Sequence, residues 1–162
     1  ASCLLTDLPT RARTLQDRGI PVLQLWEWAV KTLDGLVLPR TIVHGDFAPW
    51  NLRVCRGTLM AFDWEYGHCD GLPLLDEMHH LVQVGFLVHD WSVTRALEEL
   101  RRHAARGRPG LRREQIRALQ AVYLLDAYLR RKEEGHPASD ALLARQAEMV
   151  TRVAISAGVR AA

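Results

Sequence analysis

A polar stretch at residues 44–51, H-G-D-F-A-P-W-N, constrains this chain most, because short β-branched runs bracket it within an otherwise helical pattern. Residues 40–43 precede it, and residues 51–54 and 58–62 are typical of two further short strands joined at residues 55–57. A second polar segment, F-D-W-E at residues 62–65, closes this hairpin. The polar side chains therefore stand at strand ends and in connecting loops, where a rigid scaffold can aim them.

Helical periodicity covers most of the remaining chain. The predicted helices are residues 22–33, 74–88, 92–105, 111–134 and a last one from about 139 to 157, whereas residues 10–15 hold a helical turn or two. Ser92 is expected to cap the third of these helices, and residues 66–73 are expected to form a glycine-punctuated loop. A helix, a small β cluster and four further helices predict an α+β fold that is mainly α.

The composition favours one soluble domain over residues 1–162, since 48% of the residues are hydrophobic and no internal repeat divides them. Three widely spaced cysteines without a C-x-x-C pair favour a reducing cytoplasm. No apolar run approaches the roughly 20 residues of a membrane span, and no signal pattern opens the chain. We therefore expect a cytoplasmic protein without a membrane partner.

Charge gives little indication of a nucleic-acid partner, because the formal net charge is only +2. Arginines do gather between Arg95 and Arg117, and such a surface could attract an anionic partner. No aromatic residues interleave with them, so we favour a solvated helical surface and expect no nucleic-acid partner.

The residue types at the two polar segments suit phosphoryl transfer, which needs charge neutralisation and alignment more than covalent chemistry. Asp46 is the candidate carboxylate that orients an acceptor hydroxyl and takes its proton late. Asn51 offers a neutral oxygen to Mg²⁺ and Asp63 an anionic one, and the five-residue interval could place Asp46 and Asn51 on opposite sides of the phosphate. Glu65 is a secondary candidate, and the competing interpretation is that these residues only cap turns.

The motif H-G-D-x-x-x-x-N, followed by a hairpin and D-W-E, resembles that of aminoglycoside phosphotransferase and choline kinase-like enzymes, which are relatives of protein kinases. The resemblance implies that Asp46 is the catalytic aspartate, that Asn51 and Asp63 bind Mg²⁺ and ATP, and that His44 braces the loop. The segment G-L-P-L-L-D at residues 71–76 is similar to the family's G-x-P-x-x-D, whose aspartate, here Asp76, caps the next helix and tethers the catalytic region.

The resemblance covers about residues 22–157 and implies the helical C-terminal lobe of a protein kinase-like fold, with the β hairpin carrying the catalytic loop. The family's N-terminal nucleotide lobe, with its strand lysine, has no counterpart, since the only lysines are Lys31 and Lys132 in predicted helices. We therefore interpret the chain as part of a longer ATP-dependent kinase that phosphorylates a small hydroxylated acceptor. The alternative is a non-catalytic kinase-like scaffold or interaction module.

A cluster of histidines with a cysteine, and one aspartate in a helix, are two further candidates for a binding site. His68, Cys69, His79 and His80 could form a zinc site, but neighbouring helical histidines point about 100° apart and do not easily share an ion. Asp126 interrupts an apolar helical run, and the resemblance implies that an acid of the helical lobe could bind a cationic or hydroxylated acceptor. A surface acid that faces water is the interpretation we favour for Asp126.

Overall fold

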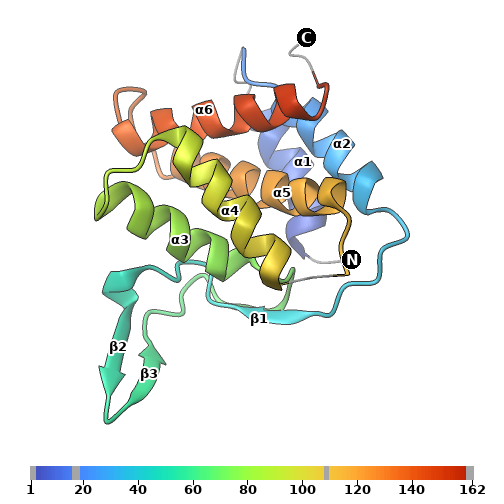
Figure 1. The fold of residues 1–162 in the computed structure, drawn as a ribbon. Helices are drawn as coiled ribbons and strands as arrows, with labels where there is room; N and C mark the ends of the chain where they lie inside the picture. Colours follow the sequence, from blue (N-terminus) through green and yellow to red (C-terminus); the bar gives the residue numbers. More distant parts are fainter. Residues whose placement is uncertain (1–2, 16–18, 108–109, 160–162) are drawn as a thin grey trace. The chain divides into compact units, whose positions relative to one another are not determined.

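Helices dominate the structure, a computed structural model that describes residues 3–15, 19–107 and 110–159 (Figure 1). The contacts divide the chain into two compact units, one from residues 3–36 with 108–162 and the other from residues 37–107. We call them the helical unit and the site unit. The prediction of a mainly α, α+β fold is confirmed, whereas the kinase-like lobe and the single domain stay predictions.

The helical unit is built around one long helix. Its elements are α1 (Cys3–Leu15), α2 (Val22–Leu33), α5 (Arg113–Glu133) and α6 (Ala141–Ser156). The other three helices of this unit all pack on α5, in which Leu119, Leu124 and Leu125 are completely buried. Apolar residues on nearly every side make α5 a core helix rather than a surface helix.

Two helices of the helical unit, α1 and α6, begin at other residues than predicted. The helix α1 extends from Cys3, although Pro9 lies inside it, because Leu8 and Ala12 are buried and offset the local penalty of proline. The bounds of α2 are as predicted, and Leu25 is completely buried in it. The helix α6 begins at Ala141 rather than at about residue 139, with Asp140 as its cap, since the Asp140 carboxylate accepts a 2.7 Å hydrogen bond from the N–H of Leu143.

The site unit begins with short strands. Its strands are β1 (Thr41–Val43), β2 (Leu52–Cys55), β3 (Thr58–Ala61) and β4 (His68–Gly71), with a 3₁₀ turn, η1, at Pro49–Asn51. The antiparallel pair β2–β3 is the predicted hairpin, and its two-residue turn has positive φ at Arg56 and Gly57. Two successive residues with positive φ are typical of the tight turns that match strand twist.

The strand β4 was expected to be part of a loop. It pairs antiparallel with β1, with Thr41 opposite Gly71 and Val43 opposite His68. A side chain at residue 71 would collide with Val43, so glycine lets the two strands approach closely. The sequence H-C-D-G has little strand propensity, and pairing with a distant segment therefore decides its conformation.

Two helices complete the site unit, α3 (Leu75–Leu87) and α4 (Val93–Gly107), and they pack against each other. Ser92 caps α4 as predicted, since its hydroxyl accepts a 3.3 Å hydrogen bond from the N–H of Arg95. The helix α3 starts after Pro73 and Leu74, so Pro73 precedes the first turn rather than standing in it. None of the described helices combines the length and apolar character needed to span a membrane.

Candidate functional site

His44 lies directly after β1 and is 1% exposed, beneath the predicted catalytic loop. The N–H of Asp46 donates to its Nδ1 at 3.3 Å, so the ring proton is on Nε2. That Nε2–H donates in turn to the backbone oxygen of Phe62 at 2.7 Å, and the Trp64 ring packs 4.6 Å away between centroids. The imidazole thus joins the loop to the end of the hairpin, which fits the bracing role implied by the resemblance.

The loop backbone is tethered by Asp76, whose two carboxylate oxygens accept hydrogen bonds from the N–H groups of His44 (2.7 Å) and Gly45 (3.0 Å). Asp76 does not cap its own helix, because the N-cap position of α3 is Leu74. Gly45 has φ +84°, and a Cβ there would lie 2.7 Å from Tyr66, so only glycine fits. The loop is therefore held by charge-assisted bonds and by close packing.

Asp46 and Asn51 are in direct contact. The Nδ2 of Asn51 donates to both the Oδ2 and the backbone oxygen of Asp46, each at 2.9 Å. Both partners are acceptors, so the amide nitrogen must face them and the amide oxygen remains for a cation. The two side chains were expected on opposite sides of a phosphate, but in the structure they are adjacent and hydrogen-bonded to each other.

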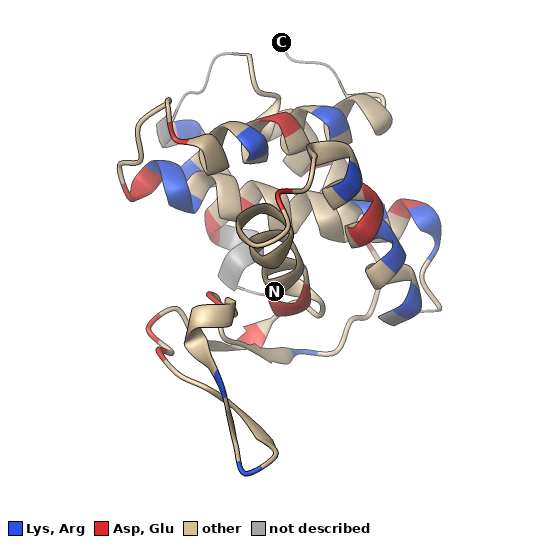
Figure 2. Ribbon diagram, turned by 60° about the vertical axis from the view of Figure 1, so that its left-hand side comes forward, with Lys and Arg blue, Asp and Glu red and all other residues tan. Residues whose placement is uncertain are grey.

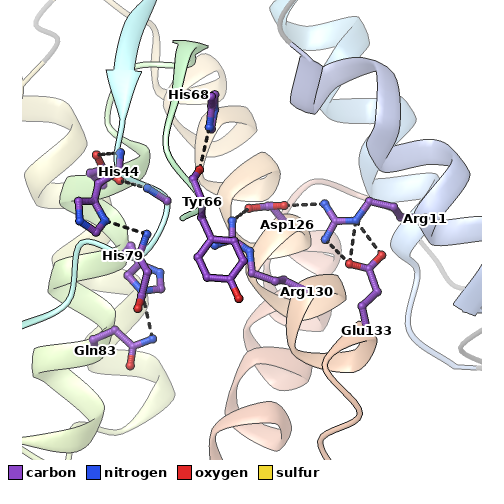
Figure 3. Close-up of polar contacts among 12 residues, drawn as sticks. Arg11, His44, Tyr66, His68, His79, Gln83, Asp126, Arg130 and Glu133 are labelled. Carbon is purple, nitrogen blue, oxygen red and sulfur yellow. Dashed lines mark hydrogen bonds and ion pairs between the residues drawn. The ribbon is translucent and has the colours of Figure 1, made fainter. Parts of the chain in front are cut away.

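The second oxygen of Asp46 bonds to His79, a residue that sequence analysis had weighed only as a zinc ligand (Figure 3). The distance from His79 Nε2 to Asp46 Oδ1 is 2.8 Å. This hydrogen bond is the main cause that lowers the pKa of Asp46, with help from Asn51 and Trp50, while partial burial opposes it. The carboxylate is thus kept ionised, and its side chain remains 31% exposed to a reactant.

Asp63 follows the hairpin, directly after Phe62. The N–H of Phe62 donates to the backbone oxygen of Asn51 at 2.9 Å, and its carbonyl accepts from His44. These two bonds fix the chain just before Asp63, which is exposed and has φ +64°. A left-handed conformation is uncommon outside glycine, although Asp and Asn tolerate it best, and such positions cluster at functional sites.

The residues predicted to bind Mg²⁺ would offer it the Asn51 amide oxygen and the Asp63 carboxylate. Within residues 3–15, 19–107 and 110–159, no cluster of three or more His, Cys, Asp or Glu side chains is arranged to hold a metal ion. Mg²⁺ does not need such a cluster, because it typically uses one or two protein oxygens together with substrate phosphates and water. Glu65 lies exposed in the turn after Asp63 and contributes no described bond to Asp46 or Asn51.

Asp126 belongs to an ion-pair network of the helical unit (Figure 3). Its two oxygens accept from Arg11 and Arg130, each at 2.7 Å, and Arg11 also binds Glu133 through Nε at 2.8 Å. The residue is 9% exposed, so the favoured interpretation of a water-facing acid is wrong. Because both oxygens are already paired with arginines, the network joins α1 to α5 and leaves no basis for acceptor binding.

No protein-family model, curated protein or solved structure matches the chain. The resemblance to small-molecule kinases therefore rests on the residues of the two motifs and on their order along the sequence. His79 is the residue that sequence reasoning missed. Its spacing could have revealed it, because Asp76, His79 and Gln83 recur at three and four residues and so form one polar stripe on α3.

Proposed function

We propose that the site unit carries the acceptor-and-metal half of a phosphotransfer site, in a kinase that moves the γ-phosphate of ATP to a small hydroxylated acceptor. The observation that supports this most is the contact between Asp46 and Asn51 in a loop held by Asp76. An ionised, partly exposed carboxylate beside an amide with a free oxygen meets the requirements of acceptor activation and metal binding.

Asp46 receives the proton in this scheme. The acceptor oxygen bonds to the γ-phosphorus, the bond from phosphorus to the bridging oxygen breaks, and its electron pair leaves with ADP. The hydroxyl proton passes to Asp46 late in the transfer, when the attacking oxygen has become acidic. A lowered pKa suits this role, because the carboxylate must be ionised and oriented rather than strongly basic.

Asn51 and Asp63 would hold Mg²⁺ through one neutral and one anionic oxygen. A bound Mg²⁺ would supply positive charge that neutralises the phosphates. The two residues come from the ends of one hairpin, where the N–H of Phe62 bonds to the backbone of Asn51. Both candidate ligands therefore flank the same end of the hairpin.

The nucleotide would be gripped by residues outside these 162, as in kinases with two lobes. Neither lysine of the chain stands on a strand, because Lys31 lies in α2 and Lys132 in α5. A phosphate-binding lysine of the kinase type therefore has no place on the strands described here. Sequencing the reading frame upstream for a lysine-bearing strand tests this part of the proposal.

The decisive experiment is ATP-dependent phosphorylation of a panel of hydroxylated small molecules by the full-length protein and its Asp46→Asn variant. The variant keeps the shape of the side chain but loses the base, so turnover should fall about 100- to 10,000-fold while Mg-ATP binding is retained. Glu77→Gln removes one negative charge from an exposed position of α3 and serves as the control. Near-normal turnover by Asp46→Asn would reject the assignment and favour the scaffold alternative.

A further inference from the structure

The polar stripe of α3 faces the predicted catalytic loop with three side chains. Asp76 holds the loop backbone at His44 and Gly45, and His79, one turn further along, reaches the Asp46 carboxylate. Gln83 follows after another turn, with its amide nitrogen 3.4 Å from His79 Nε2. One helix therefore positions both the backbone of the loop and its reactive side chain.

The Asp46 carboxylate is fixed by one donor at each oxygen. Asn51 in η1 binds Oδ2 at 2.9 Å, and His79 in α3 binds Oδ1 at 2.8 Å. Two bonds from separate elements prevent rotation of the carboxylate about its last single bond, whereas one bond alone would allow it to swing. The orientation of the base therefore depends on His79 as much as on Asn51.

The ring of His79 must present Nε2–H to Asp46, because an ionised carboxylate only accepts hydrogen bonds. Its side chain is 14% exposed, so few water molecules can replace the contact. Gln83 is 6% exposed and its Oε1 has no described partner, so a half-turn of the amide would bring this acceptor toward the same N–H. In that orientation the Gln83 oxygen would accept from the same N–H that donates to Asp46.

We propose that His79 is a positioning residue for the phosphotransfer reaction, which holds the Asp46 carboxylate in the orientation that receives the acceptor proton. The inference rests on the proposed function, since it assigns a role to His79 through Asp46. It goes beyond the resemblance to small-molecule kinases, which implies no role for His79.

The first arm of the test is NMR of the full-length protein labelled with ¹⁵N-histidine, which needs no turnover. His79, identified by the signal lost in His79→Gln, should carry its proton on Nε2, and Asp46→Asn should shift that resonance. An unprotonated Nε2, or a resonance that is unchanged by Asp46→Asn, would overturn the contact and with it the proposal.

The second arm is kinetic. His79→Leu removes the donor at similar volume and should lower kcat about 100-fold, the usual cost of misplacing a reactive group, with little change in the KM for ATP. His79→Gln restores an N–H donor and should recover most of the lost kcat. His89→Leu, at an exposed histidine beyond the end of α3, should behave as wild type.

The outcomes separate this inference from the proposed function. Absence of ATP-dependent turnover in the wild-type protein would reject the proposed function together with the catalytic meaning of the contact. Turnover in the wild type with an unaffected His79→Leu would reject the positioning role alone. Equal losses of kcat in His79→Leu and His79→Gln would also reject the positioning role. Gln restores an N–H donor, so it should recover kcat if the donor matters, and it should not do so if His79 acts only through its shape.

Discussion

In the helical unit α5 is buried along almost its whole length, whereas in the site unit the β2–β3 hairpin leaves large apolar side chains exposed. The exposed large apolar side chains of the hairpin and of the residues next to it are Trp50, Val54, Leu59, Met60, Phe62, Trp64 and Tyr66. In Figure 2 this hairpin is drawn mostly in tan, with basic positions on β2 and at its turn. The hairpin therefore buries far less apolar surface than α5 does, and it contributes less to stability.

Polar groups also serve different ends in the two units. In the helical unit, Arg11 and Arg130 each bind one oxygen of Asp126, so the network joins helices. In the site unit, His79 and Asn51 each bind one oxygen of Asp46 but leave the carboxylate partly exposed. The helical unit therefore holds most of the buried apolar side chains, while the site unit keeps one charged group oriented and accessible.

The largest expected effect on stability is in the core of the helical unit. Leu124→Ala should lower the free energy of unfolding by about 2–5 kcal/mol, because it leaves a cavity at a side chain that is 0% exposed. Leu59→Ala, in the hairpin at 57% exposure, is the control and should cost far less. Urea denaturation of both variants measures the difference, and similar losses would break the contrast between the units.

A smaller and more local effect is expected at Asp76. Asp76→Ala leaves the N–H groups of His44 and Gly45 without their acceptor. The free energy of opening the loop at residues 44–51 should therefore fall by about 1.5–3 kcal/mol. That decrease corresponds to roughly 10- to 150-fold faster hydrogen exchange at these two amides. Glu77→Ala removes a neighbouring exposed acid from the same helical turn and should leave the exchange unchanged. A global loss of stability without faster exchange at the loop would contradict the tether.

The smallest effect concerns Asp140, where hydrogen bonds from Arg131 and from the N–H of Leu143 lower the carboxyl pKa in the folded protein. The folded pKa lies below the unfolded value of about 4, so this stabilisation is present above pH 4 and disappears as the pH falls. Asp140→Asn should therefore be less stable than wild type at pH 7 by about 1 kcal/mol or less, because the pair is near solvent.

The matching measurement is the difference in Tm between wild type and Asp140→Asn from pH 7 to pH 3. The difference should narrow toward low pH as the wild-type carboxyl becomes protonated. Asp34→Asn, at the exposed end of α2, provides a control with the same chemical change. A difference in Tm that widens toward low pH would show that the pKa of Asp140 is not lowered in the folded protein.

Local sequence signals predicted those parts of the structure whose residues interact with near neighbours. The bounds of α2, the hairpin turn at Arg56 and Gly57 and the Ser92 cap all follow from side chains within a few residues. The contact between Asp46 and Asn51 also joins near neighbours in the sequence, but it was not predicted, because the two side chains were expected on opposite sides of a phosphate.

Tertiary structure decided the features whose partners lie far apart in the sequence. The strand β4 forms because β1 pairs with it, Asp126 is buried because Arg11 reaches it from α1, and His79 binds Asp46 from α3. In each case the local pattern was compatible with another conformation or environment, and a distant partner selected one. The sequence by itself therefore indicated the loop at residues 44–51 and its candidate residues, whereas packing of remote elements determined which side chains hold that loop.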